Sequence, residues 1–180
     1  GVSYEDPAAL PLVHKLAETM QYSLIMASCD LAKEKGACDD FVETKYYRGE
    51  LPSDHYKPEV DEIVSNDLHC NWEVLRSLVR EYGLRNSTLT AQMPSESSSV
   101  VCNATNGVEP PRDYLSVKKS KKGTLKQIVP SYGTLKNQYT LLWDMKSMDG
   151  YLNIMRARYD TVGNMVERLQ PHGGRHLFYY

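Results

Sequence analysis

The sequence predicts an α/β fold from three observations. Apolar residues recur at helical spacing after Asp6-Pro7, the stretch 87–93 alternates polar and apolar residues as a strand does, and 114–129 has the pattern of a hairpin. The strand pattern at 87–93 leads directly into a serine-rich turn that starts at Pro94. Helices and strands that follow one another in this way indicate a chain of mixed α and β structure.

The composition is that of one compact soluble domain. The chain has 180 residues, of which 41% are hydrophobic and 24% are charged. Its formal net charge is −2 and its isoelectric point is about 6.2, so no overall positive field attracts nucleic acid or anionic membranes. The apolar stretches are far shorter than the ~20 residues that span a bilayer, and the first residues, GVSYEDPAAL, lack a signal-peptide pattern. We therefore expect a cytoplasmic protein that binds neither nucleic acid nor a membrane.

Two helices are predicted in the first half of the chain. The first follows Asp6-Pro7 and ends at Gly36, and one of its faces is apolar. That face consists of Leu12, Leu16, Met20, Leu24 and Leu31, widened by Val13 and Ile25. The second helix is capped by Asn71 and ends at Gly83, with an apolar face of Trp72, Leu75, Val79 and Tyr82. Between the helices, 37–67 reads as a long irregular connection with one helical turn after Pro58, packed by Phe41, Tyr46, Tyr47 and Tyr56.

The second half predicts a hairpin and further helical segments. The predicted strands are Tyr114–Lys119 and Thr124–Val129, joined by Ser-Lys-Lys-Gly. The lysines at this connection are better explained as a solvated hairpin tip than as a nucleic-acid site. A third helical face contains Leu135, Tyr139 and Leu142, with Trp143 beside it, and is broken by Asp149-Gly150. The remainder is predicted to be helical around Ile154–Met155 and Val162–Leu169 and to close on a short apolar strand at 177–180.

The cysteines and histidines form no recognisable site. Cys29, Cys38, Cys70 and Cys102 contain no C-x-x-C pair and have no histidine at zinc-finger spacing. The five histidines share no spacing with acidic or thiol residues that would indicate a metal site or a nucleophilic triad. We expect reduced, mostly buried thiols and no metal bound by this chain.

The junction at Pro94-Ser95-Glu96-Ser97-Ser98 has two explanations. The start of a helix presents unpaired backbone N–H groups and a partial positive charge, which suit a phosphate. Serine-rich turns also cap helices routinely, and from the residues alone capping is the commoner use. The spacing of these residues leaves both explanations open. The terminal pair Tyr179-Tyr180 could be a redox pair, but as a bare dipeptide in a chain with 13 tyrosines it carries almost no weight.

Two longer stretches resemble one known family. They are GLRNSTLTAQMPSESSS at 83–99 and NATNGVEPPR at 103–112, and the segments LAKEKGAC at 31–38, LLWDM at 141–145 and DGYL at 149–152 agree with them. Together they resemble the class I ribonucleoside-diphosphate reductase large subunit of the bacterial and T-even phage type. The resemblance is clear over residues 1–155, while 156–180 are shortened and divergent, and the whole of 1–180 is identified as the C-terminal part of the barrel domain.

The resemblance implies a fold and a site. The fold would be a partial ten-stranded α/β barrel, about half of the complete one, with a hairpin excursion. The loop Pro94, Ser95, Glu96, Ser97 and Ser98 would bind the phosphates of a nucleoside diphosphate, and Ser97 keeps the hydroxyl of the threonine that the family often has there. Tyr179 and Tyr180 would be the end of the family's radical-transfer path.

The resemblance also implies what this chain lacks. The family's radical cysteine, at least one of its reducing cysteines and its nucleotide-binding regulatory regions lie upstream of the match, and none of the four cysteines here has a matching context. The expected partners are therefore the upstream part of the large subunit, a small subunit with a radical-generating metal centre, and thioredoxin- or glutaredoxin-type reductants. Alone the chain would be inactive. A non-catalytic remnant or phosphate-binding module is the alternative.

Overall fold

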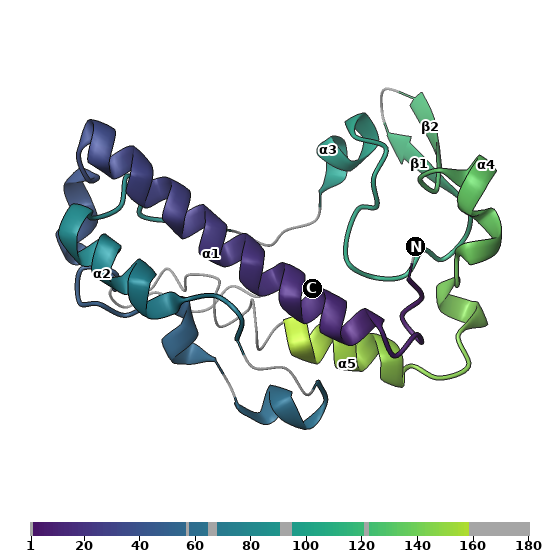
Figure 1. The fold of residues 1–180 in the computed structure, drawn as a ribbon. Helices are drawn as coiled ribbons and strands as arrows, with labels where there is room; N and C mark the ends of the chain where they lie inside the picture. The colour runs from purple at the N-terminus through teal and green to yellow at the C-terminus, as the bar shows by residue number, and fades with distance from the viewer. Residues whose placement is uncertain (1, 57, 65–67, 91–94, 121–122, 159–180) are drawn as a thin grey trace, which may run out of the picture.

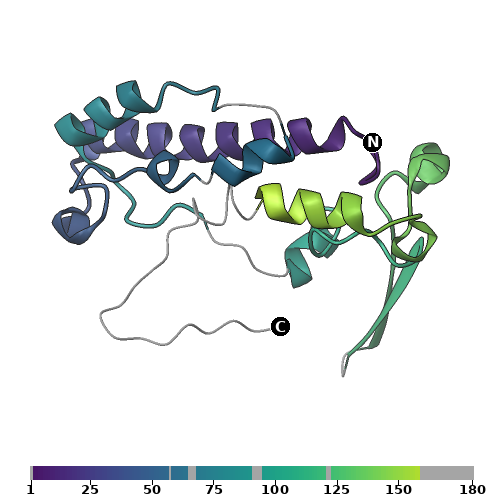
Figure 2. The same ribbon diagram turned by 90° about the horizontal axis from the view of Figure 1, so that it is seen from below.

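A computed structural model describes residues 2–56, 58–64, 68–90, 95–120 and 123–158. The long helix α1 (Ala9–Lys35) forms the axis of the molecule, with α2 (Trp72–Tyr82) along its C-terminal half and α5 (Asp149–Arg158) along its N-terminal half (Figure 1). A second group of elements lies beside and beyond the N-terminal end of α1 (Figure 1). It contains α3 (Glu96–Val101), the hairpin of β1 (Leu115–Ser120) and β2 (Gly123–Ile128), and α4 (Tyr132–Leu135), and Figure 2 shows the hairpin projecting from it.

Local signals set the ends of α1 and α2 as predicted. The backbone N–H of Ala8 donates to Asp6 Oδ1 at 2.8 Å just before α1, and Gly36 ends the helix at φ 81°. The side chain of Asn71 accepts a hydrogen bond from the backbone N–H of Val74 and caps α2, which ends at Gly83 with φ 74°. A positive φ is strained for residues with a Cβ atom, so glycine stops both helices.

The apolar face of α1 that the spacing defines is not the face that is buried within this chain. Leu12, Leu16, Met20 and Leu31 are exposed. The buried face combines small or apolar residues with polar ones, namely Ala9, His14, Ala17, Glu18, Gln21, Ile25, Ser28, Cys29 and Ala32. The spacing of apolar residues locates an apolar face on the helix. Which face is buried depends on the helices and loops that pack on it, and the spacing does not reveal these.

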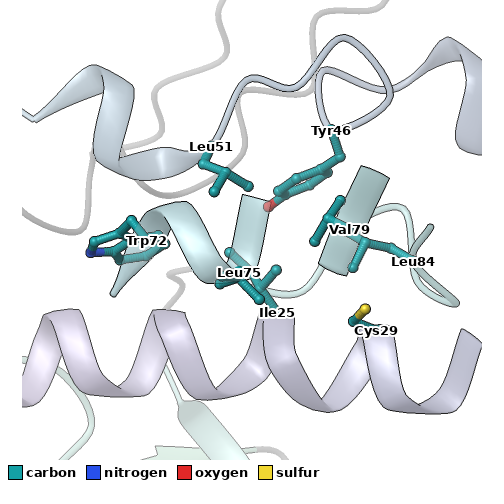
Figure 3. Packing of buried hydrophobic residues seen from close by; sticks show 8 residues of the cluster. All are labelled: Ile25, Cys29, Tyr46, Leu51, Trp72, Leu75, Val79 and Leu84. Atoms are coloured by element: carbon teal, nitrogen blue, oxygen red, sulfur yellow. The ribbon is translucent and has the colours of Figure 1, made fainter. Parts of the chain in front are cut away.

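The apolar core lies between α1, α2 and the connection that joins them. This cluster consists of Ile25, Cys29, Tyr46, Leu51, Trp72, Leu75, Val79 and Leu84 (Figure 3). The connection contains three short 3-10 helices, η1 (Asp39–Glu43), η2 (Pro52–His55) and η3 (Pro58–Glu62), which confirms the helical turn after Pro58. Tyr46 is buried as predicted. Tyr47 is largely exposed, but its ring packs edge-on against that of Phe41 with the ring centroids 5.8 Å apart, so it also packs the connection.

A buried carboxylate joins α1 to the segment that precedes α2. Glu18 is fully buried, and its two oxygens accept hydrogen bonds from the backbone N–H groups of His69 and Cys70, both at 2.8 Å, and from the indole N–H of Trp72 at 3.0 Å. A buried charge is tolerated only when it is hydrogen-bonded, and these three donors satisfy it.

A histidine one turn earlier on α1 anchors the connection. His14 Nε2 lies 3.1 Å from the hydroxyl of Tyr56, which donates its proton to Asp61 at 2.7 Å. Because the tyrosine proton is used by Asp61, His14 must donate from Nε2, which leaves Nδ1 without a partner among the described residues. Burial is the main cause that lowers the pKa of His14, since it disfavours the charged imidazolium.

The hairpin is confirmed, but the barrel is not. Leu115 pairs with Ile128 and Ser120 with Gly123 in an antiparallel register, and Gly123 has a φ of 130° as its turn role requires. This hairpin is the one sheet within the described residues. Residues 87–90 of the predicted strand are not in a strand, while 91–93 and the strand predicted at 177–180 lie outside the described part of the chain.

The prediction of a third helix through Leu135, Tyr139 and Leu142 is wrong. Instead of one helix, the chain forms α4 and two single 3-10 turns, η4 (Lys136–Gln138) and η5 (Leu142–Asp144). Polar groups of this segment bond to residues outside it. The Tyr139 hydroxyl donates to the Pro130 carbonyl, and the Leu142 N–H donates to the Pro111 carbonyl. Asp149-Gly150, predicted to break a helix, instead starts α5, which confirms the helix predicted around Ile154.

Replacing Glu18 by glutamine should destabilise the fold. The amide group of glutamine turns a donor toward the N–H groups that Glu18 now accepts, so at least one of them loses its acceptor, at a cost of about 1–3 kcal/mol. Chemical denaturation would measure the change. Glu34→Gln, at an exposed position of the same helix, should change the stability by less than about 0.5 kcal/mol. Equal stabilities of the two variants would contradict a stabilising role of Glu18.

Stability should fall as the pH is lowered through the ordinary pKa range of histidine, and His14 should be one cause. The pKa of His14 is lowered in the folded state, so below about pH 6.5 the unfolded chain binds a proton that the folded chain resists. His14→Gln should therefore flatten the pH dependence of the unfolding free energy between about pH 7.5 and 5.5. His55→Gln, at a more exposed side chain, is the control. Parallel pH profiles for wild type and His14→Gln would exclude this role.

Candidate functional site

The candidate site lies at the start of α3, where the serine-rich turn becomes helical. Ser95 immediately precedes the helix, and its side chain makes no capping hydrogen bond. The first hydrogen bond of the helix joins the Ser99 N–H to the Ser95 carbonyl at 2.8 Å. Helix geometry provides no acceptor within the helix for the N–H groups of the first turn. The Ser95 hydroxyl therefore does not cap α3, as the simple capping explanation would require.

The serines of α3 divide into an exposed pair and a buried one. Ser97 and Ser98 are exposed, whereas Ser99 is buried. The following segment folds back on the turn, because the Ala104 N–H donates to the Ser99 carbonyl at 2.8 Å and the Ser95 N–H donates to the Asn106 carbonyl at 2.9 Å. The two exposed serines thus belong to a turn of α3 that is closed by backbone hydrogen bonds.

The segment that leads into the turn is attached to α1. The Ser28 hydroxyl accepts from the Asn86 N–H at 3.0 Å and donates to the Asn86 side chain at 3.1 Å, and the Ser28 carbonyl accepts from the Arg85 N–H. Further along, the Thr90 hydroxyl donates to Gln21 Oε1 at 3.2 Å. Residues 85–90 therefore follow the polar residues of α1 toward the serine turn.

Sequence reasoning missed these attachments, although a signal for them was present. His14, Gln21 and Ser28 are spaced by seven residues, which places them on one side of a helix. Polar residues repeated on one side of a helix indicate hydrogen bonds to neighbouring segments, because buried polar groups need partners.

Other predicted site residues fall outside what the structure describes. Pro94, Tyr179 and Tyr180 lie outside the described residues, and Glu96 is described only by its backbone in α3. The phosphate-loop prediction is therefore represented here by Ser95, Ser97 and Ser98.

The described cysteines do not form a reactive centre. All four thiols are free. Cys29 is buried, Cys38 and Cys70 are partly buried and Cys102 is exposed, so the expectation of mostly buried thiols is only partly met. Burial raises the pKa of Cys29 and of Cys70, which lowers their thiolate fraction. In the described part of the chain no three His, Cys, Asp or Glu side chains gather as metal ligands, and no helix there is long and apolar enough to cross a membrane.

Comparison with known proteins identifies a family. The model of the family described as "Ribonucleotide reductase, barrel domain" matches residues 1–169. The ribonucleoside-diphosphate reductase subunit alpha of Buchnera aphidicola from Acyrthosiphon pisum is 56% identical over 153 residues, which cover 85% of this chain and 20% of that protein. The Escherichia coli K12 reductase 1 subunit alpha is 53% identical over 155 residues, covering 86% of this chain and 20% of the relative.

The match extends to a bacteriophage. The ribonucleoside-diphosphate reductase subunit alpha of Enterobacteria phage T4 is 48% identical over 143 residues, 79% of this chain and 19% of the phage protein. The chain thus spans about a fifth of the length of these relatives. The resemblance drawn from the serine turn and its flanking segments is confirmed: the chain belongs to the ribonucleotide reductase barrel-domain family and corresponds to part of the large subunit.

Proposed function

We propose that this chain supplies the substrate-phosphate loop of a ribonucleoside-diphosphate reductase large subunit. The loop consists of Pro94, Ser95, Glu96, Ser97 and Ser98. The assembled enzyme would reduce ribonucleoside diphosphates to deoxyribonucleotides, the precursors of DNA. This chain would hold the substrate, while the cysteine chemistry would come from the upstream part of the large subunit.

The observation that carries this proposal is the exposed serine pair at the start of α3. The hydroxyls of Ser97 and Ser98 lie on the surface, and Ser95 makes no side-chain capping bond. Hydroxyls and backbone N–H groups at the start of a helix are suited to phosphate oxygens, because both can donate hydrogen bonds to a negatively charged ligand.

The attachment of the loop to α1 supports the same role. A phosphate contributes strong binding only when its donors are already held in position. The contacts of Ser28 with Asn86 and of Gln21 with Thr90 hold residues 86–90, which precede the turn in the sequence, and the Ser95–Asn106 backbone bond ties the start of α3 to the segment that follows it. The described residues before the turn and at the start of α3 thus have partners before any ligand binds.

The remaining chemistry needs partners. The upstream part of the large subunit would bring the radical and reducing cysteines, a small subunit with a metal centre would generate the radical, and thioredoxin- or glutaredoxin-type proteins would restore the reduced state. Tyr179 and Tyr180 would pass the radical toward the substrate. The chain alone would bind nucleotide without reducing it.

Replacing both exposed serines by alanine should weaken substrate binding. In an assembly of this chain with the upstream part of the subunit, Ser97→Ala with Ser98→Ala removes two hydroxyl donors to the phosphates. Each charge-assisted hydrogen bond is worth about 1.5–3 kcal/mol, so affinity for a ribonucleoside diphosphate should fall at least about 10-fold. Titration calorimetry would measure it.

Ser116→Ala, at an exposed serine of β1, is the matched control and should leave the affinity unchanged. If the double variant also binds as tightly as wild type, the loop assignment is wrong. Tight binding without any diphosphate reduction in the presence of the small subunit would instead indicate a phosphate-binding module that has no part in catalysis.

Replacing Tyr180 by phenylalanine should stop turnover and leave substrate affinity intact. Phenylalanine fills nearly the same space but has no O–H group from which a hydrogen atom can be transferred. Steady-state deoxyribonucleotide formation and equilibrium nucleotide binding, measured on the same assembly, separate the two effects. Tyr47→Phe, at an exposed tyrosine, should keep full activity. Normal turnover in Tyr180→Phe would reduce the tyrosine pair to a packing role.

A further inference from the structure

Helix α1 has a second apolar face, opposite the polar residues that hold the loops. We call it the outer face of α1 and define it as Leu12, Leu16, Met20, Leu24, Ala27 and Leu31. Leu16 and Met20, at its centre, are 59% and 50% exposed, and Leu12 and Leu31, at its ends, are 43% and 39% exposed. Leu24 is half-buried and Ala27 is exposed. Water therefore contacts large aliphatic side chains along most of the helix.

This distribution is unusual for a helix at the surface of a complete domain. A surface helix normally turns its apolar side inward and its polar side to water. In α1 the buried side carries His14, Glu18 and Gln21, while the outer face is aliphatic. From Leu12 to Leu31 the outer face extends about 29 Å at about 1.5 Å per residue.

The spacing of the outer face shows what kind of partner fits it. Leu12, Leu16, Met20 and Leu24 follow one another at intervals of four residues. Such a row forms the ridge that packs into the grooves of another element in globular proteins, with helix axes crossing at about −50°. Two-stranded coiled coils need a mean interval of about 3.5 residues, because a row at intervals of four winds around the helix. The row from Leu12 to Leu24 is therefore poorly suited to coiled-coil pairing with a second copy of α1.

The area of the outer face also argues against a second copy of α1 as its partner. A strip about 29 Å long and about 10 Å wide covers roughly 300 Å², so two copies would bury about 600 Å² in total. Stable protein interfaces bury about 1,200 Å² or more. The outer face needs a partner that is held by additional contacts elsewhere.

The geometry points to another segment of the reductase large subunit, outside these 180 residues, as the element that covers the outer face of α1. The inference rests on the proposed function, in which the chain works with the rest of that subunit. The curated relatives are about five times as long as the region they share with this chain, so most of their polypeptide has no counterpart here. α2 and α5 lie along α1 without covering this face (Figure 1).

The test compares the isolated chain with a full-length chimera in which the chain replaces the matching segment of the Escherichia coli relative. Met20 is a native probe, because its sulfur is oxidised by hydroxyl radicals only where it is accessible. Peptide mass spectrometry should show Met20 oxidised at least about 10-fold more slowly in the chimera. Equal oxidation rates would overturn the inference.

A charge placed on the outer face gives an independent measurement. In the chimera, Leu16→Glu should lower the melting temperature by at least about 5 °C or prevent folding, because a carboxylate would be buried. In the isolated chain it should shift the melting temperature by no more than about 1–2 °C, since Leu16 is exposed there. Lys15→Glu places a carboxylate at the adjacent exposed position, off the outer face, and should be tolerated in both proteins. A chimera that tolerates Leu16→Glu as well as Lys15→Glu would refute the inference.

Experiments on the isolated chain test two other elements that could cover the outer face, namely residues 159–180 and a second copy of the chain. If removal of residues 159–180 speeds the oxidation of Met20, the chain covers its own outer face and the inference is wrong. A dimer in analytical ultracentrifugation that Leu16→Glu dissociates and Lys15→Glu does not would assign the face to a second copy. None of these measurements involves a nucleotide, so failure of the phosphate-loop assignment would leave their outcome unchanged.

Discussion

The described structure depends on the buried carboxylate of Glu18, which needs hydrogen-bond donors around it. Glu18 lies in the interior, and a charge there is stable only with donors directed at it. Those donors come from His69, Cys70 and Trp72, so the start of α2 has a single position relative to α1. The apolar core then forms between two helices whose register is already set. Hydrophobic contact supplies much of the stability, but hydrogen bonds to one side chain determine which residues meet.

The same side of α1 organises the irregular parts of the chain. His14 contacts the connection at Tyr56, Gln21 contacts Thr90, and Ser28 contacts Asn86. Irregular backbone carries N–H groups that regular structure would pair internally, and Glu18 and Ser28 of this side accept hydrogen bonds from such N–H groups. The polar side of α1 thus holds these irregular segments, including residues 85–90, which precede the serine turn in the sequence.

Sequence reasoning succeeded where signals were local and failed where partners were distant. Gly36, Asn71, Gly83 and Gly123 carry their structural roles in their own conformational preferences, so the helix ends and the hairpin followed from them. Segment 135–143 has helical spacing, yet its groups pair with Pro111 and Pro130, which no local pattern reveals. For the serine turn, the residues alone left capping and anion binding open. The resemblance named a ligand, and the contacts of Gln21 and Ser28 became visible only in three dimensions.

The two faces of α1 connect the candidate site with the rest of the subunit. Its inner side holds the segment that leads to Ser95, Ser97 and Ser98, and its outer side presents an aliphatic ridge to water. A rigid helix transmits a displacement along its whole length, because its backbone bonds resist bending. Any element that packs on Leu16 and Met20 would therefore restrict the motion of the side that carries Gln21 and Ser28. Under the proposed function, assembly with the remainder of the large subunit would restrain residues 85–90, which precede the serine turn in the sequence, even though the partner touches none of them.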